Sequence, residues 1–473
     1  MVDPVLASRL QFAWTIAVHI VFPTITMGLA PFLVYWTYRE ITGAGEIYAR
    51  LRRFWTKIFA ITFVTGTVTG IVLEFEFGTN WAAYASAVGG IFGGPLATEG
   101  LMAFFLESTM LGIFLFGRDR VSDRAYFASS VLVGLGSWLS AVWILIANSW
   151  MQTPRGFALR ERAGATIDLA PKVPGTQVAV ITDPLAAYLN PRFPWMFAHM
   201  QMAAVLSAAL FIAGIAAYKL LRTDRDGAFW RKTMKVAVVA MLITAPFQAV
   251  QGDAYGRHVH ETQPAKMAAI DALWETQAYA PEYLVAIPAN PNDLLSPEPD
   301  EMIRIGIPAG ASILASGGDP SAVLEGFEAF EHDVPPFMLV FWSFRAMVGL
   351  GFWFIFLAFW AAYRWRKGEL FEDRLLLKSL VASTGLGVLA LEFGWMVTEI
   401  GRQPWAIQGV LKVSEGVSPG LTGAEATLTL AGFVLGYTAL FSVWGYLVYR
   451  IVRSGPDEPD STASGAETGV TAE

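Results

Sequence analysis

The chain has no cysteine and is poor in charged residues. Of its 473 residues, 15% are Asp, Glu, Lys or Arg, compared with about 25% in soluble globular proteins. The absence of thiols excludes disulfide bonds, cysteine nucleophiles and clusters held by cysteine. A net charge of −7 argues against binding to nucleic acid. The chain is instead 54% hydrophobic, with 17 Trp and 33 Phe, a composition that indicates a helical integral membrane protein.

Nine apolar segments are long enough to cross a bilayer, which takes about 20 residues of α-helix. They cover residues 11–38, 58–78, 95–117, 125–151, 196–221, 234–251, 336–363, 379–402 and 424–449. The first segment contains a histidine and a proline, and no small-residue cleavage site follows it. We therefore interpret it as a retained helix and not as a cleaved signal. The sequence predicts an all-α integral membrane protein, a bundle of nine transmembrane helices.

Basic residues concentrate in alternate connections between these segments. Well over half of the 33 Lys and Arg residues fall in 39–57, 118–124, 219–235, 364–378 and 450–453. By the positive-inside rule, the N-terminus is expected outside and the C-terminus in the cytoplasm. The chain then divides into helices one to six (1–251), an extracytoplasmic loop (252–335), helices seven to nine (336–453) and a tail (454–473) that is predicted to be disordered.

Polar residues inside the spans are functional candidates, because ionisable groups are costly in hydrocarbon. Four potential iron ligands, His19, His199, Met347 and Glu399, are expected in the outer half of the bilayer on four different helices. A helix bundle can build a cofactor site from such inward side chains. A His–Met pair suits a low-spin haem, and a single His or carboxylate leaves a position open for oxygen.

The same residues also have a structural interpretation. A single membrane histidine is often a hydrogen-bonded core residue, and methionine usually fills space. Glu74, Glu76 and Glu392 can simply bond neighbouring helices. On this interpretation the chain is a proton-coupled membrane carrier whose buried glutamates bind protons. A third alternative is a quinol-oxidising cytochrome that passes electrons to another protein. The remaining histidines, at 258, 260 and 332, are expected to be solvated in the outer loop.

Three groups of motifs resemble subunit I of the cytochrome bd quinol oxidases. The first is residues 78–81 (GTNW) with 94–100 (GPLATEG) and 104–107 (FFLE); the second is 140–145 (SAVWIL) with 148–154 (NSWMQTP); the third is 394–405 (GWMVTEIGRQPW). The third motif is the most specific, and the likeness extends from residue 1 to about residue 450. A count of nine spans with an outer N-terminus agrees with this family.

The resemblance implies cofactors and ligands. The cofactors are two haem b, one low-spin and one high-spin, and one haem d. His199 and Met347 match the axial pair of the low-spin haem b. His19 and Glu399 match ligands of the two high-spin haems, and which haem each residue holds stays open. Trp395, one turn before Glu399, matches a residue placed among the haems that assists electron transfer.

Further positions match residues that move protons or bind charged groups. Glu99, Glu107 and Ser140 match a proton route to the high-spin haems. A guanidinium can bind a haem propionate in bidentate fashion, and three arginines are suited to this: Arg9, Arg345 and Arg402.

Residues 263–274 (QPAKMAAIDALW) resemble the quinol-binding loop of the same family. The resemblance implies that Gln263, Lys266 and Asp271 meet the quinol. Lys266 can hydrogen-bond a quinone oxygen or a haem propionate, and a carboxylate at position 271 can accept a quinol proton. The family usually has Glu at this last position, so the shorter Asp271 is a departure. Only residues 275–344 separate Trp274 from Arg345. A loop of this length resembles that of the short-loop branch of the family.

The implied activity is that of a terminal oxidase of the prokaryotic cell membrane. Quinol, either ubiquinol or menaquinol, is oxidised at the outer face and O2 is reduced to water with protons from the cytoplasm. This arrangement generates proton motive force without pumping. The implied partners are quinol, O2, the lipid bilayer and a large membrane subunit II, with room for a small single-span subunit.

Overall fold

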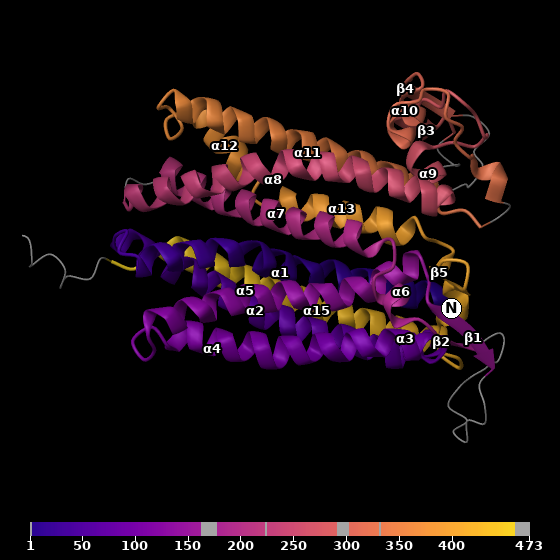
Figure 1. The fold of residues 1–473 in the computed structure, drawn as a ribbon, viewed down its shortest axis with the longest axis horizontal. Helices are drawn as coiled ribbons and strands as arrows, with labels where there is room; N and C mark the ends of the chain where they lie inside the picture. Colours follow the sequence, from indigo (N-terminus) through magenta and orange to yellow (C-terminus); the bar gives the residue numbers. More distant parts are fainter. Residues whose placement is uncertain (1, 162–176, 223–224, 291–301, 331–332, 459–473) are drawn as a thin grey trace, which may run out of the picture.

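The computed structural model describes residues 2–161, 177–222, 225–290, 302–330 and 333–458. Most of the tail that is predicted to be disordered, and His332 of the outer loop, lie outside the described residues. Within them the protein is a bundle of long helices with short strands and helices gathered at one end (Figure 1).

Seven helices of 30 or more residues form most of the bundle. They are α1 (Pro4–Ile41), α2 (Glu46–Thr79), α5 (Asp123–Gln152), α7 (Phe193–Arg222), α8 (Gly227–Thr262), α11 (Phe337–Arg366) and α15 (Gly423–Ser454). At about 1.5 Å per residue, each exceeds the ~30 Å of a hydrocarbon core. Their ends therefore reach beyond the bilayer, where polar groups can be solvated.

Two further membrane crossings are composite. α3 (Ala82–Leu101), a π-helical segment (Met102–Glu107) and α4 (Ser108–Phe116) form one crossing, which begins 13 residues before the expected start at residue 95. α12 (Arg374–Ala382) and α13 (Leu386–Ile400) form another, bent by 41°. The described residues thus contain eight candidate spans, or nine with the bent pair, and the predicted helical membrane bundle is confirmed.

The bend between α12 and α13 was not expected from the sequence, which predicts one continuous span. Hydropathy does not reveal it, because the break is made by hydrogen bonds of Ser383 and Thr384. The indole of Trp353 donates to the Ser383 hydroxyl at 2.9 Å and holds the break against α11. Gly385, a poor helix former, follows directly.

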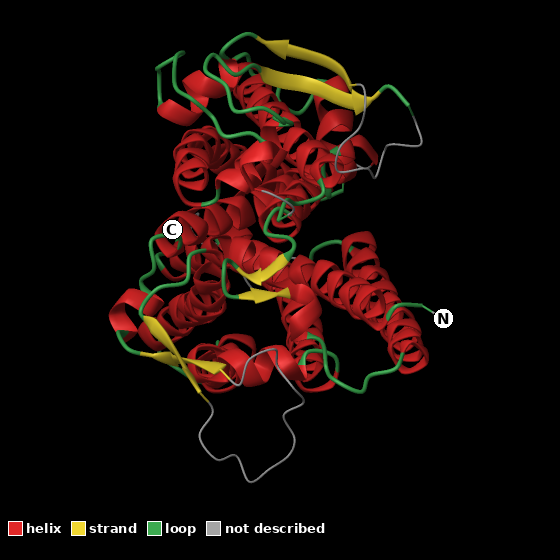
Figure 2. Cartoon of the chain, turned by 90° about the vertical axis from the view of Figure 1, so that its right-hand side faces the viewer, coloured by secondary structure: helices red, strands yellow, loops and turns green. Residues whose placement is uncertain are grey.

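All three strand pairs lie at one end of the bundle, which we call the strand end (Figures 1 and 2). Each pair is antiparallel: β1 (Phe157–Glu161) with β2 (Gln177–Ile181), β3 (Glu282–Pro288) with β4 (Met302–Ile307), and β5 (Trp405–Ile407) with β6 (Leu411–Lys412). Short helices accompany them: α6 (Pro184–Tyr188), α9 (Pro264–Asp271), α10 (Gly310–Ser316), a 3-10 turn (Phe327–Phe330) and α14 (Val413–Gly416).

The opposite end, which we call the basic end, carries the Lys- and Arg-rich connections. There Glu40 pairs with both Arg52 and Arg118, and Arg50 pairs with Asp226. The N-terminus and the loop between α8 and α11 share the strand end (Figure 1). The two ends of the molecule therefore differ in charge as the sequence predicts.

Helix α8 extends to Thr262, past the expected end at residue 251. The added turns are polar and include an Asp253–Arg257 ion pair of 2.8 Å, so an apolar window does not detect them. As a result His258 lies on a helix, is 8% exposed and stacks on Trp195 with ring centroids 6.1 Å apart. The expectation that it is solvated in a loop is wrong. His260, on the same helix, is half-buried.

Candidate functional site

His199 lies on α7 and directs its ring at α8. Its Nδ1 is 2.5 Å from Oε1 of Gln251. That amide is oriented by a second bond, in which Nε2 of Gln251 donates to the carbonyl of Trp195 at 2.9 Å. The amide oxygen can only accept, so Nδ1 of His199 carries the proton and Nε2 keeps a free lone pair.

His19, on α1, is arranged in the same way toward α2. Its Nδ1 is 2.9 Å from the hydroxyl of Thr69. That hydroxyl also lies within hydrogen-bond distance of the carbonyls of Thr65 and Gly66, either of which can take its proton and leave its oxygen to accept from the ring. We assign the ring proton to Nδ1 on this basis, which leaves the lone pair on Nε2 available to a ligand.

Three of the four predicted iron ligands face a glycine on a neighbouring helix. A Cβ atom added to these glycines would lie 3.0–3.2 Å from the ligand side chain: Gly70 from His19 Cε1, Gly252 from His199 Cε1 and Gly394 from Met347 Sδ. These distances are tighter than ordinary van der Waals contact. A larger residue at any of these positions would displace the side chain beside it.

Glu399, on α13, receives hydrogen bonds on both carboxylate oxygens. Oε1 accepts from Asn148 at 2.9 Å and from Gln152 at 3.3 Å, both on α5. Oε2 accepts from Arg402 at 2.6 Å. Asn148 and Gln152 belong to the motif at 148–154 but were given no role from the sequence. Their spacing of four, which puts both on one helix face, is the signal that could have identified them.

Trp395 packs against a buried apolar cluster that includes Ile20 of α1, Leu145 of α5 and Met200 of α7. Ile20 directly follows His19, and Met200 directly follows His199. The indole therefore lies among the helices that carry both histidines. The place of Trp395 among the haems and its role in electron transfer stay predictions.

Lys266 joins the loop between α8 and α11 to the membrane helices. Its side chain is buried, and Nζ donates to Oε1 of Gln152 at 2.7 Å and to the carbonyl of Thr398 at 2.9 Å. Because Gln152 in turn donates to Glu399, one hydrogen-bonded chain runs from Lys266 to Glu399. Burial lowers the pKa of Lys266 well below its usual value, and the nearby arginines lower it further.

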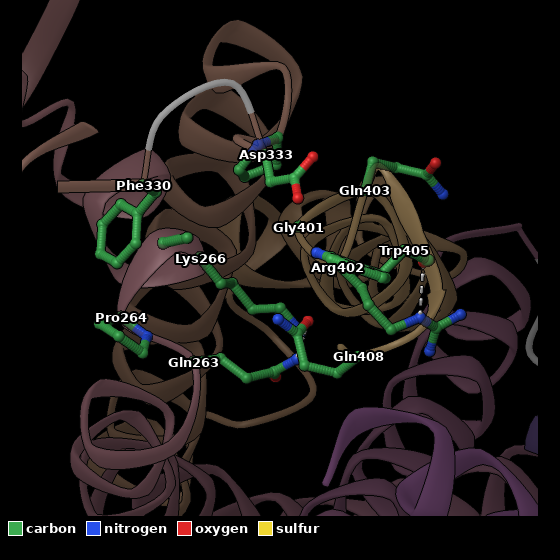
Figure 3. Close-up of a pocket in the computed structure, with 12 residues that line it drawn as sticks. Gln263, Pro264, Lys266, Phe330, Asp333, Gly401, Arg402, Gln403, Trp405 and Gln408 are labelled. Atoms are coloured by element: carbon green, nitrogen blue, oxygen red, sulfur yellow. Dashed lines mark hydrogen bonds between the residues drawn. The ribbon is translucent and has the colours of Figure 1, made fainter. Parts of the chain in front are cut away.

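Two motifs that are distant in the sequence interlock at Lys266. A Cβ atom added to Gly401, in the motif at 394–405, would lie 2.8 Å from Cγ of Lys266. Only glycine leaves room for the lysine stem there. Beside this contact is a cavity of about 100 Å³, shown in Figure 3. Gln263 and Lys266 line one side, and Arg402, Gln403 and Trp405 line the other.

Arg345, on α11, binds the loop between α8 and α11. Its Nε donates to the carbonyl of Tyr283 at 2.6 Å, Nη1 is 2.9 Å from Oε1 of Glu282, and Nη2 is 3.9 Å from Oδ1 of Asp271. Burial raises the pKa of Asp271 well above its usual value, and the charge of Glu282 raises it further. Burial likewise raises the pKa of Glu282. Glu282 was not recognised from the sequence.

Of the other two arginines, Arg402 binds Glu399 and donates from Nε to the carbonyl of Trp405 at 3.2 Å. Its Nη1 is buried and has no hydrogen-bond partner among the described residues. Arg9 is exposed near the start of α1. The prediction that these arginines pair with propionates is untested for all three.

The three predicted proton-route residues lie along the contact between the third crossing and α5. Ser140 Oγ donates to Oε1 of Glu99 at 2.7 Å. Glu107 ends the π-helical segment and is 4% exposed. A Cβ atom added to Gly136 would lie 2.6 Å from its Cγ. Gly136 and Ser140 are one turn apart on α5, so Glu107 and Glu99 meet the same face of that helix.

Taken together, these features define a multi-pass helical membrane protein with imidazole, thioether and carboxylate side chains between its helices and a loop joined to them by hydrogen bonds. The sequence profile of the family described as "Cytochrome bd terminal oxidase subunit I" matches residues 7–456. The chain belongs to this family, and it is a cytochrome bd-type quinol oxidase subunit of the bacterial membrane.

Individual relatives agree with this assignment over nearly their whole length. The "Cytochrome bd ubiquinol oxidase subunit 1" of Bacillus subtilis (strain 168) is 32% identical, covering 95% of this chain and 94% of that protein. The "Cytochrome bd-II ubiquinol oxidase subunit 1" of Escherichia coli (strain K12) is also 32% identical, with 98% of each covered. The solved bd oxidase of Geobacillus thermodenitrificans matches with a TM-score of 0.84 and 30% identity, covering 96% of this chain and 99% of that one.

The family implies haem cofactors, and the residues present fit them. The hydrogen bonds at Nδ1 of both membrane histidines suit the tautomer that leaves Nε2 free, the nitrogen expected to bind iron in that case. Beside Glu399, Nη1 of Arg402 is buried without a partner among the described residues. A buried N–H donor needs an acceptor, and a haem propionate could supply one.

Proposed function

We propose that this chain is the haem-carrying subunit of a terminal oxidase that takes electrons from quinol at the strand end and reduces O2 to water. The proposal is supported above all by the two histidines, each fixed by a polar neighbour with Nε2 free. In the family's reaction two quinols and one O2 give two quinones and two water molecules. The haems supply one-electron steps and oxygen binding.

We assign two haem b and one haem d to the chain, as in the family. His199 and Met347 would hold the low-spin haem b; His19 and Glu399 would serve the two high-spin haems. Gln251 and Thr69 orient the two histidines. Because Glu399 is held by Asn148, Gln152 and Arg402, its carboxylate is fixed in direction.

The quinol would meet Lys266 and Gln263 at the cavity beside the motif at 394–405, with Asp271 farther along α9. Quinol oxidation releases two protons and two electrons. The chain Lys266–Gln152–Glu399 places the loop in direct contact with a ligand-bearing helix. Binding at the loop can therefore influence the position of Glu399.

We place the strand end outside and the basic end in the cytoplasm, by the positive-inside rule. Protons from quinol then leave outside, and protons for water formation enter from the cytoplasm along Glu107, Ser140 and Glu99. Charge is thereby separated across the membrane without a proton pump. Exposed apolar faces on α11 and α15, such as Phe352 (66% exposed) and Leu428 (75%), would meet lipid and subunit II. A small single-span subunit can be accommodated.

Absorption spectra and oxygen uptake of the purified complex test this function. Bands of reduced haem b and haem d are expected, with oxygen uptake that depends on quinol. A proton-coupled carrier with structural histidines would be colourless. A cytochrome that serves another protein would show haem bands without oxygen uptake. Either result would contradict the proposal.

The Gln251→Leu variant should weaken the low-spin site without removing it. Loss of the acceptor at Nδ1 makes the His199 imidazole less basic, so the midpoint potential of its haem should rise. Binding of the haem should weaken by about 10–100-fold, the usual cost of removing such a partner. A redox titration followed at the low-spin band measures the first effect, and haem retention during dilution measures the second.

Gln248→Leu is the matched control. Gln248 lies one turn earlier on α8 and donates to the backbone carbonyl of His199 at 3.1 Å, not to the ring. The Gln248→Leu variant should therefore leave the midpoint potential of the low-spin haem nearly unchanged. Equal shifts in both variants would mean that Gln251 acts only through helix packing.

The Lys266→Met variant should impair quinol oxidation more than oxidation of an artificial donor. Met keeps the stem that packs on Gly401 and removes the amine that donates to Gln152. A hydrogen bond to a charged group contributes roughly 1.5–3 kcal/mol, so the quinol-dependent rate should fall about tenfold or more. Lys57→Met, which removes an exposed lysine paired with Asp457 at the basic end, is the control. If Lys266→Met lowered the rate equally with quinol and with the artificial donor, Lys266 would have no specific role in quinol oxidation.

A further inference from the structure

Glu282, the first residue of β3, is brought into the same site as Asp271 of α9. The two acids face one cation from different elements. Arg345 Nη1 lies 2.9 Å from Oε1 of Glu282, and its Nη2 lies 3.9 Å from Oδ1 of Asp271. The Nε bond to the carbonyl of Tyr283 fixes the guanidinium against β3. The position of Glu282 is thus set by the fold of the loop.

The two acids differ in their access to solvent. The side chain of Asp271 is 1% exposed, and among the described residues no donor N–H or hydroxyl bonds to its oxygens, so a carboxyl proton shared with Glu282 is the hydrogen bond open to it. The side chain of Glu282 is 13% exposed. A buried carboxylate that takes a proton from a substrate needs a group that passes the proton on, since it cannot release the proton to water itself. Glu282 is the acid next to it that reaches the surface.

The charges favour one proton on this pair. Two carboxylates beside a single guanidinium leave one negative charge in excess, and burial makes that charge costly. When the pair holds one proton, the group as a whole is neutral. Two carboxyls that interact this closely titrate as a unit. Arg304 of β4, over the ring of Tyr283 at 5.5 Å, is a further charged group beside this cluster.

We propose that Glu282 is a further proton-carrying residue of quinol oxidation, which receives the proton from Asp271 and delivers it to the outer solvent. The inference rests on the proposed function of the loop. The quinol O–H bond breaks and an O–H bond forms on Asp271. The proton then moves to Glu282 and to water, and O2 takes the electrons in the overall reaction.

The test compares Glu282→Gln with Glu325→Gln, which removes an exposed acid of the same loop. Gln can still accept a hydrogen bond from Arg345, so the loop should fold. In Glu282→Gln the quinol-dependent kcat should fall about tenfold or more, less than the 10²–10⁴ of a direct proton-transfer group. The acidic limb of its pH profile should move to lower pH, because removal of the neighbouring charge lowers the pKa of Asp271.

Two further measurements keep the outcomes distinct. Infrared difference spectra should show a protonated carboxyl band near neutral pH that changes in Glu282→Gln and in Asp271→Asn but not in Glu325→Gln. Oxidation of an artificial donor should be unchanged in all three. An unaltered pH profile and carboxyl band in Glu282→Gln would overturn the role of Glu282. A wild-type complex that oxidises no quinol would instead overturn the proposed function.

Discussion

The His199→Ala variant is expected to lose the low-spin haem and, with it, quinol-driven oxygen uptake. The ring is the only His side chain on α7, and its Nε2 is the nitrogen left free by Gln251. Removal of a ligand costs more than removal of the group that orients it, so the quinol-dependent rate should fall by more than about 100-fold. The reduced-minus-oxidised spectrum and oxygen uptake measure the two losses.

The His260→Ala variant controls for general damage to the fold, and Met347→Leu tests the second predicted ligand of the same haem. His260→Ala removes a half-buried histidine of α8 and should leave the spectrum and the rate close to wild type. Met347→Leu nearly conserves volume, a change that usually costs less than about 1.5 kcal/mol in stability, and should alter the same low-spin band. A normal low-spin spectrum in either His199→Ala or Met347→Leu would refute the axial pair.

The overall fold could be predicted because it depends on the length and polarity of single segments. Apolar runs of sufficient length indicate the spans, and the Lys and Arg of segments such as 39–57 indicate which ends lie together. The bend at Ser383 could not be predicted, since it depends on a hydrogen bond from Trp353 of another helix. The polar end of α8 could not be predicted either, because a search for apolar segments does not detect a turn held by the Asp253–Arg257 ion pair.

The candidate site was predictable to a smaller extent. His19, His199 and Glu399 are conspicuous as polar residues in apolar segments. Their partners are not, because Thr69 and Gln251 are ordinary polar residues until the neighbouring helix is known. Glu282 is less conspicuous still. It follows Asp271 by eleven positions in a loop, and only the fold of β3 brings it to Arg345.

The Glu107→Gln variant is expected to slow oxygen reduction while quinol still reduces the haems. Gln has nearly the same shape and can take the place beside Gly136, but it cannot carry a proton as a carboxyl does. General acid–base groups contribute about 10²–10⁴-fold, so turnover should fall about 100-fold. Stopped-flow absorbance separates the two half-reactions, with fast haem reduction by quinol and slow reoxidation by O2.

Ser140→Ala should have a smaller effect of the same kind, because it removes only the 2.7 Å bond to Glu99. Ser130→Ala is its control on the same helix: that hydroxyl donates to the carbonyl of Phe127 and not to a glutamate. If Glu107→Gln left oxygen uptake unchanged, the protons would have to enter along another path. If it slowed haem reduction equally, Glu107 would act on the structure of the site and not on proton supply. Slow reoxidation of the haems with normal haem reduction would therefore identify the contact between the third crossing and α5 as the route that supplies protons for oxygen reduction.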